Sequence, residues 1–286
     1  MNKDRYLIIG GDSIVGQHLK SQYNKRNSQV LYTTRRKDAQ GEDMLFLDLS
    51  EHNDAWKPPY EFKAIFFCAA ITSMDYCQRH KEESRNVNID NTINIIEKIS
   101  AHGIPIIYLS STQVFGTGHY PDESVSVCPV NEYGYQKSKV EEKIIDLGQI
   151  HAVARITKVV HKKYSLFKDW VSKLKSGHTI HAFTNYFFSP VSVDFLGEIL
   201  IRIAEYENRG GIWHVSGNKD ISYYDAARII SQTIGVSPGL VKGVDVHEYL
   251  ENIPVTSSTV LRCNRIISEL GVHPPDVVNT IKQVVI

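Results

Sequence analysis

Cysteine is scarce in this sequence, and the four cysteines do not form the pattern of a metal site. They stand at positions 68, 77, 128 and 263, with no CxxC pair among them. Zinc sites usually draw on closely spaced cysteines, and the His178–His181 pair has no cysteine or carboxylate at ligand-like spacing. We therefore expect free thiols in a reducing compartment and no metal site.

Long apolar runs and an excess of either charge are also missing. No run is long enough to span a bilayer, and no signal-peptide pattern precedes the first strand-like run. The 32 basic and 32 acidic residues cancel, so no field of the whole molecule attracts nucleic acid or an anionic membrane. We expect a cytoplasmic protein that binds neither, and the sequence leaves a homodimer open.

The first half of the chain alternates short apolar runs with helical patterns. The runs lie at 6–9, 30–33, 44–47, 64–68, 104–109 and 152–156, and the helical patterns at 14–23, 84–102 and 132–147. Runs that are apolar on both faces are typical of a buried parallel sheet. Residues 1–157 are therefore predicted to form an α/β, Rossmann-type, doubly wound parallel sheet that binds a dinucleotide.

The second half, residues 158–286, has a looser pattern. It predicts helices at 166–175, 194–206 and 223–233 and strands at 179–183 and 212–215. We expect a smaller C-terminal lobe, with some of its segments returning to the sheet.

A glycine-containing loop follows the first predicted strand and opens the first predicted helix. Gly10 permits the tight turn, Gly16 lets the helix and strand pack closely, and amides at the helix N-terminus can bind a pyrophosphate. Ser13 replaces the usual second glycine, and its hydroxyl can donate to a phosphate oxygen. The residues expected to contact the cofactor here are Gly10, Asp12, Ser13, Ile14, Val15 and Gly16. A structural turn is the alternative.

The second predicted strand ends in Thr34, Arg35 and Arg36, where an NAD site usually presents an acidic residue and an NADP site an arginine. This favours NADP(H), although NAD(H) stays possible if both arginines only face solvent. Asp48 and Leu49 end the third strand, where Asp48 can accept a hydrogen bond from adenine. A simple turn aspartate is the alternative.

Tyr133 and Lys137 stand four residues apart on a predicted helix that begins after Asn131. Both side chains therefore project from one helix face. A nearby ammonium favours the charged form of a phenol, so we expect Lys137 to lower the pKa of Tyr133 and Tyr133 to act as an acid. Ser111 lies at the carboxyl end of the fifth predicted strand, the edge at which ligands bind an open parallel sheet.

Several segments, in this order along the chain, resemble the extended short-chain dehydrogenase/reductase superfamily. They are Gly10-x-x-Ser13-x-x-Gly16, 67–70 (FCAA), Val87-Asn88, 110–116 (SSTQVFG) and 129–137 (PVNEYGYQK). Two later segments, 188–190 (FSP) and 211–217 (GIWHVSG), are similar to the sugar-nucleotide branch, which includes dTDP-4-dehydrorhamnose reductases and NAD-dependent epimerases and dehydratases.

By that resemblance Ser111 binds the reacting oxygen, Tyr133 is the acid/base, and Lys137 holds the nicotinamide ribose. Asn88 matches a buried supporting residue that also belongs to the cofactor site. Cys68, Ala69 and Ala70 stand where small residues let the cofactor lie across the sheet.

The resemblance implies NADPH-dependent reduction of a keto group on a nucleotide-activated sugar, bound between the lobes. The C-terminal lobe would then be the substrate-binding lobe, with Arg155 and Arg262 as either diphosphate clamps or structural residues. Thr112 and Gln113 replace the Asp-Glu pair of the dehydratases, so an acid for removing water is missing. An NAD-dependent nucleotide-sugar epimerase and a non-catalytic dinucleotide-binding regulatory subunit remain alternatives.

Replacing Arg35 and Arg36 together by alanine should weaken NADPH binding by about tenfold to a hundredfold. A charge-assisted hydrogen bond to a phosphate contributes roughly 1.5–3 kcal/mol, and about 1.4 kcal/mol corresponds to a factor of ten. NADH binding should hardly change. Titration calorimetry with each dinucleotide measures the difference, and equal losses for both would contradict the NADP assignment.

Overall fold

A computed structural model of the chain describes residues 4–26, 28–38, 41–59, 61–116, 120–249 and 258–286. The chain divides into two compact units. Unit 1 comprises Met1–Gly116, Ser126–Arg155 and Gly197–Trp213, and unit 2 comprises Thr117–Val125, Ile156–Leu196 and His214–Ile286. No helix among the described residues is long and apolar enough to cross a membrane.

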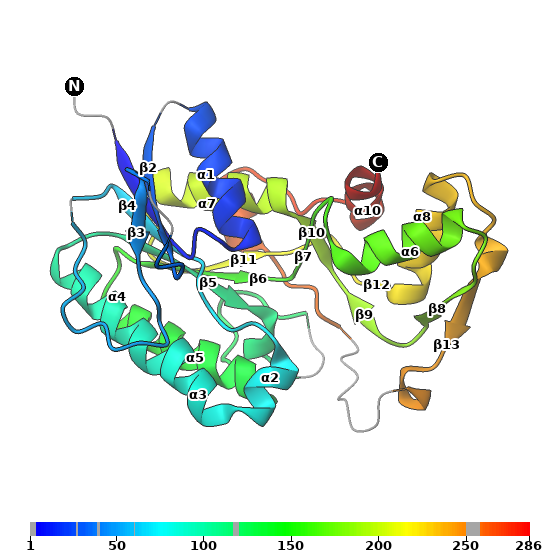
Figure 1. The fold of residues 1–286 in the computed structure, drawn as a ribbon, viewed down its shortest axis with the longest axis horizontal. Coiled ribbons are helices and arrows are strands. Elements are labelled where there is room, and N and C mark those ends of the chain that lie inside the picture. The colour runs from blue at the N-terminus through cyan, green and yellow to red at the C-terminus, as the bar shows by residue number, and fades with distance from the viewer. Residues whose placement is uncertain (1–3, 27, 39–40, 60, 117–119, 250–257) are drawn as a thin grey trace. The chain divides into compact units, whose positions relative to one another are not determined.

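Unit 1 is built on a seven-stranded sheet with the order β11-β6-β5-β4-β1-β2-β3 (Figure 1). The strands are β1 (Arg5–Ile9), β2 (Gln29–Thr34), β3 (Met44–Phe46), β4 (Ala64–Phe67), β5 (Ile106–Ser111), β6 (Ala152–Ile156) and β11 (Gly211–Val215). β1 pairs in parallel with both β2 and β4, and β4 with β5. The strand order reverses between β1 and β4, which is where open parallel sheets bind ligands. The predicted fold class is confirmed.

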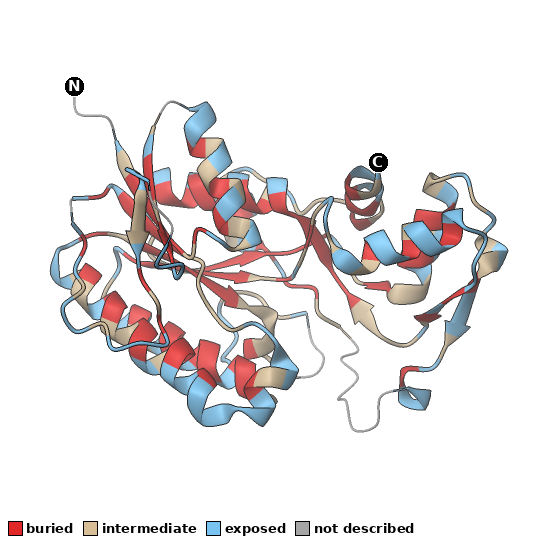
Figure 2. Cartoon of the chain, in the orientation of Figure 1, coloured by how far each residue is buried: buried red, intermediate tan, exposed pale blue. Residues whose placement is uncertain are grey.

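Helices cover both faces of this sheet. α1 (Ile14–Lys25) and α7 (Val193–Glu205) lie on one face, and α4 (Thr92–Ala101) and α5 (Glu132–Asp146) on the other (Figure 1). Every residue of β4 is buried, as Figure 2 shows for the central strands, because side chains on both of its faces meet helices. The apolar runs seen in the sequence are the core of this sandwich.

The prediction of one continuous helix over 84–102 is wrong, because the structure divides this stretch into several helical segments. The structure has α2 (Met74–Arg79), α3 (Lys81–Arg85) and a π-helical segment, η1 (Asn86–Asn91), ahead of α4. A π-turn holds one more residue than an α-turn. Thr92 donates its hydroxyl to the Val87 carbonyl at 2.9 Å, which satisfies a backbone oxygen in this wider turn.

Unit 2 packs α6 (Ser165–Lys175), α8 (Tyr223–Thr233) and α10 (Val277–Val285) around a separate apolar core. Three two-stranded pairs border it: β7–β10, β9–β12 and β8–β13. Their bounds are β7 (Lys158–Val160), β8 (Ile180–Phe183), β9 (Phe187–Phe188), β10 (Pro190–Ser192), β12 (Ile221–Ser222) and β13 (Val241–Val244). Unit 2 also contains η3 (Pro238–Leu240), η4 (Val246–Glu248) and α9 (Asn264–Ser268), whereas η2 (Thr112–Val114) belongs to unit 1.

Two segments depart from a division of the chain at residue 157. Residues 197–213, which contain most of α7, belong to unit 1, where Arg26 pairs with Glu205 at 3.1 Å. Residues 117–125 belong to unit 2, where the Arg265 amide donates to Glu123 at 3.1 Å. The first segment includes the start of β11, an edge strand of the seven-stranded sheet, whereas the place of the second had no signal in the sequence.

A buried ion pair joins α5 to β6 within unit 1. Arg155 donates to both oxygens of Glu141, with its shortest contact at 2.7 Å, and the two side chains are 3% and 2% exposed. Ser110 donates its hydroxyl to the same carboxylate. Arg155 is therefore committed to the interior of the fold, which favours the structural role over the clamp.

Glu141→Gln should destabilise the protein by about 3–5 kcal/mol, because it leaves the Arg155 guanidinium buried without a counter-charge. Glu142→Gln is the matched control, since its neighbouring carboxylate on the same helix is exposed and pairs with Lys139 at the surface. Thermal and urea unfolding of both variants measure the difference. Equal effects would show that the buried pair contributes no more than the surface pair.

Candidate active site

Two glycines allow close backbone contacts in the loop of residues 10–16 that joins β1 to α1, called the phosphate loop below. Gly10 has φ +87, and a Cβ built on it would lie 2.6 Å from the Ala69 amide nitrogen. A Cβ on Gly16 would overlap the Gly10 carbonyl oxygen. Any larger residue would push the end of β1 away from the segment that follows β4, or push α1 away from β1. The sequence interpretation of both glycines agrees with this geometry.

Ser13 is the N-cap of α1, and this role was missed in the sequence. Its Oγ accepts a hydrogen bond from the Gly16 amide at 3.0 Å. The hydroxyl hydrogen can still be donated to a ligand oxygen. The amides of Ile14 and Val15 lie in the first helical turn, where helices offer no internal acceptor, so they can bind an anion. These residues fit a pyrophosphate.

Asp12, Thr34 and Arg36 form one cluster beside this loop. The Asp12 carboxylate accepts from the Thr34 hydroxyl at 2.6 Å and from the Arg36 guanidinium at 3.2 Å. Arg35 is exposed and makes no ion pair within the described chain. Arg36 is therefore held at the edge of the loop by Asp12, and Arg35 is free to turn toward a phosphate.

Asp48 and Leu49 lie after the end of β3 and adopt the turn that was the alternative in the sequence. Asp48 accepts from the amide and hydroxyl of Ser50 at 2.9 and 2.7 Å through the same oxygen, Oδ1. The Leu49 carbonyl accepts from the Asn91 side chain at 2.8 Å. Asp48 thus forms an Asx turn, and its second carboxylate oxygen is the one left for an adenine contact.

Tyr133 and Lys137 are both buried on the sheet-facing side of α5, with 8% and 4% exposure. The Lys137 ammonium donates to the Leu109 carbonyl at 2.8 Å and lies 5.9 Å from the centre of the Tyr133 ring. Burial raises the pKa of Tyr133, and Cys77 adds to that rise. The expected lowering of this pKa by Lys137 is therefore wrong, because the loss of solvent around the phenol sets the direction of the shift.

The start of α5 is fixed against the turn that follows Ser111. Asn131 caps the helix by accepting from the Gly134 amide at 2.9 Å, and it donates to the Gln113 side chain at 2.8 Å. A Cβ on Gly134 would overlap the Gln113 carbonyl, so only glycine allows this approach. The Ser111 hydroxyl oxygen accepts from the Gln113 amide at 3.2 Å, which leaves its hydrogen for a ligand.

Asn88 lies in the π-helical segment and fastens α5 to the loop after β4. It exchanges hydrogen bonds with the backbone of Ile71, at 2.8 and 2.9 Å, and donates to Gln136 at 2.7 Å. Its side chain is 2% exposed, which agrees with the supporting role implied by the resemblance. The three small residues Cys68, Ala69 and Ala70 form the start of this loop and are half-buried.

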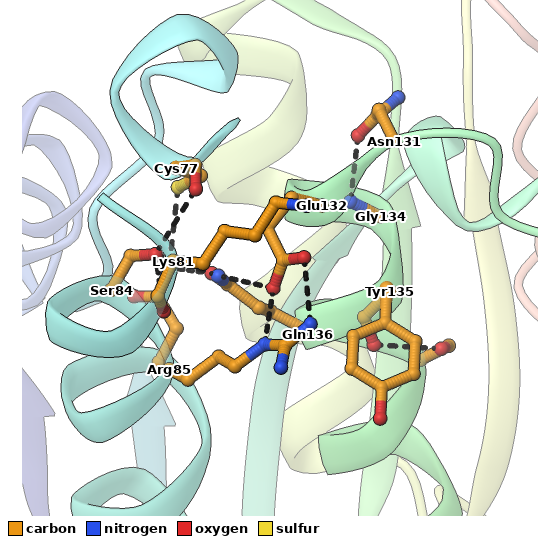
Figure 3. Close-up of polar contacts among 11 residues, drawn as sticks. Cys77, Lys81, Ser84, Arg85, Asn131, Glu132, Gly134, Tyr135 and Gln136 are labelled. Atoms are coloured by element: carbon orange, nitrogen blue, oxygen red, sulfur yellow. Dashed lines mark hydrogen bonds and ion pairs between the residues drawn. The ribbon is translucent and has the colours of Figure 1, made fainter. Parts of the chain in front are cut away.

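A polar network under Asn88 was not found in the sequence. Gln136 donates to Ser84 at 2.8 Å and to Glu132 at 3.0 Å, and Arg85 binds both oxygens of Glu132 at 2.7 and 2.9 Å (Figure 3). Burial acts to raise the pKa of Glu132, but the bonds from Arg85 and Gln136 prevail and lower it. The network holds α5 in register against α3.

The described residues include no group of three or more His, Cys, Asp or Glu side chains that could hold a metal ion. Arg262, the second clamp candidate, lies in unit 2 with its guanidinium 5.3 Å from the centre of the Tyr120 ring. The candidate site in unit 1 consists of the phosphate loop, the cluster of Asp12, Thr34 and Arg36, and the groups around Tyr133.

Comparison with known proteins places these features in one family. The family described as RmlD substrate binding domain matches residues 4–286. A dTDP-4-keto-6-deoxy-D-glucose reductase of Streptomyces niveus is 23% identical over 84% of this chain and 82% of its own. The methionine adenosyltransferase 2 subunit beta of Bos taurus is 24% identical over 91% of this chain and 78% of its own.

A solved structure shows the same fold. It is the dTDP-4-dehydrorhamnose reductase of Bacillus anthracis in complex with NADP, with a TM-score of 0.83, 19% sequence identity, and coverage of 98% of both chains. The agreement extends over both units of the chain.

Substitutions at Ser13 should separate its capping role from close approach of the cofactor. Ser13→Ala should cost about 1 kcal/mol of stability and weaken NADPH and NADH alike, because it removes the cap and a donor. Ser13→Gly should be tolerated better, since glycine caps helices almost as well and allows closer approach. Thermal unfolding and dinucleotide titration test both effects. A larger loss for Ser13→Gly than for Ser13→Ala would contradict this interpretation of the loop.

Proposed function

The chain belongs to the RmlD substrate binding domain family, and from this premise we propose that it catalyses NADPH-dependent reduction of a keto group on a nucleotide-activated sugar. The observation that carries the proposal is the pairing of Tyr133 and Lys137 on the buried face of α5, beside the turn that follows Ser111. Relatives named as reductases of 4-keto sugar nucleotides support the substrate class.

NADPH, when bound, supplies the hydride, and the protein residues prepare the carbonyl oxygen to receive a proton. The amides of Ile14 and Val15 and the Ser13 hydroxyl would hold its pyrophosphate. Arg35 and Arg36 would hold its 2′-phosphate. NADP bound to the reductase of Bacillus anthracis supports this choice of cofactor.

Tyr133 is the proton donor in this mechanism. Because burial raises its pKa, the phenol stays protonated at neutral pH and has a proton to give. Ser111 donates its hydroxyl hydrogen to the same carbonyl oxygen, while its own oxygen accepts a hydrogen bond from the Gln113 amide. Together they polarise the carbonyl and neutralise the charge that develops on its oxygen.

Lys137 orients the cofactor and stabilises the phenolate that remains after proton transfer. Its ammonium donates one of its three hydrogens to the Leu109 carbonyl, and the other two can be donated to the ribose hydroxyls. Burial lowers its pKa to about 8, with Glu141 opposing that shift. The side chain is therefore mostly charged at pH 7 and loses its charge as the pH rises past about 8.

A second candidate function is a dinucleotide-binding regulatory subunit without catalysis. The similarity to the methionine adenosyltransferase 2 subunit beta supports it. Such a protein would need the cofactor loop but would gain nothing from the tyrosine hydroxyl.

An epimerase would instead keep NAD bound through purification, which mass spectrometry of the released nucleotide detects. A homodimer and a cytoplasmic location stay predictions from the sequence.

Tyr133→Phe should lower kcat for a 4-keto nucleotide sugar by about a hundredfold to ten-thousandfold, the usual contribution of a general acid. NADPH affinity should hardly change, because only the hydroxyl is removed. Lys137→Met should lower turnover and NADPH affinity together, since the ribose contact disappears as well. Steady-state kinetics and NADPH titration measure both. Full activity in Tyr133→Phe would contradict the catalytic assignment, and wild-type protein that binds NADPH without reducing any such sugar would favour the regulatory subunit.

A further inference from the structure

Among the described residues of unit 2, Lys158 has no ion-pair partner although protein atoms surround much of its side chain. Lys158 opens β7, and its ammonium lies 5.5 Å from the centre of the Tyr164 ring. Its side chain reaches solvent, but the surrounding protein atoms lower its pKa by burial. No carboxylate of the described chain forms an ion pair with it, so the positive charge is available to an anion.

Tyr164, the ring beside this lysine, belongs to a cluster of three tyrosines with Tyr186 and Tyr223. Tyr186 and Tyr223 stack with ring centres 5.4 Å apart and an angle of 10° between the ring planes, and the Tyr223 amide donates to the Tyr186 carbonyl at 3.1 Å. Tyr164 lies near enough to raise the pKa of both phenols, after the larger effect of burial. Within the described residues, none of the three hydroxyls donates to a protein acceptor, which leaves three donors unused.

The chain around Lys158 carries positive charge only. Residues 156–168 include Lys158, Lys162, Lys163 and Lys168 and no aspartate or glutamate. The next acidic residue, Asp169, is already paired with Lys173 at 2.8 Å. An acid-free basic segment beside unused hydroxyl donors is suited to phosphate oxygens, because charged acceptors form the strongest hydrogen bonds.

We propose that Lys158, Tyr164, Tyr186 and Tyr223 bind the diphosphate of the nucleotide-activated sugar, an assignment that rests on the proposed function. The lysine ammonium meets the diphosphate as a point charge. The tyrosine hydroxyls donate to its oxygens, and the stacked rings of Tyr186 and Tyr223 keep two of these donors in fixed positions at little cost in side-chain freedom.

The test is titration calorimetry of dTDP into the full-length protein saturated with NADPH, so that the dinucleotide site is occupied. Lys158→Met should weaken dTDP binding by about tenfold to a hundredfold, while Lys158→Arg should keep most of the affinity. Tyr186→Phe should cause a smaller loss. Thymidine, which lacks the diphosphate, should bind wild type and Lys158→Met equally. Lys175→Met, an exposed lysine on α6, is the matched control and should leave dTDP binding unchanged.

Unchanged dTDP affinity in Lys158→Met, an equal loss in Lys175→Met, or no dTDP binding by the wild type would overturn the site. NADPH affinity equal to wild type in Lys158→Met shows that the variant is folded. The two proposals can fail separately. Lys158-dependent binding of dTDP by a chain that reduces no keto sugar keeps this site and removes the reaction, whereas reduction with an unchanged KM in Lys158→Met keeps the reaction and removes the site.

Discussion

The hydrogen bond from the Lys137 ammonium to the Leu109 carbonyl fixes one face of α5 to the end of β5, and the candidate active site depends on it. An ammonium buried among apolar groups is costly unless it has an acceptor, so this bond also fixes the rotation of the helix. Tyr133 lies one helical turn before Lys137 and Glu141 one turn after it. The tyrosine that we propose as the proton donor and the carboxylate that pairs with Arg155 are thus placed by the same constraint.

Close backbone contacts complete the arrangement, and they explain why particular glycines stand where they do. Gly134 lets α5 approach the turn after Ser111, and Gly10 lets the end of β1 approach the segment after β4. Each contact brings together strand or helix ends that lie far apart in the sequence. The site is therefore a property of the ends of elements, while the buried strands behind it supply rigidity.

The fold of unit 1 and the position of Tyr133 and Lys137 on one face of a helix could be predicted, because each depends on a local pattern in the sequence. Apolar runs mark buried strands, and spacing places Tyr133 and Lys137 on one helix face. The support of these residues could not be predicted, because Arg85 and Glu132 are 47 residues apart, and Gln136 and Ser84 are 52 apart. The direction of the pKa shift of Tyr133 was wrong for a related reason, since the solvent lost around a side chain is set by the whole fold. The two- and three-residue strands of unit 2 are too short to show a period.

The buried pair of Glu141 and Arg155 also limits how this protein can diverge. Loss of either partner alone leaves the other charge buried without a counter-charge, whereas replacement of both by well-packed apolar residues is tolerated in many proteins. A lineage cannot pass easily from one state to the other through single substitutions. The two positions should therefore be inherited together, and descendants should show either both charges or neither.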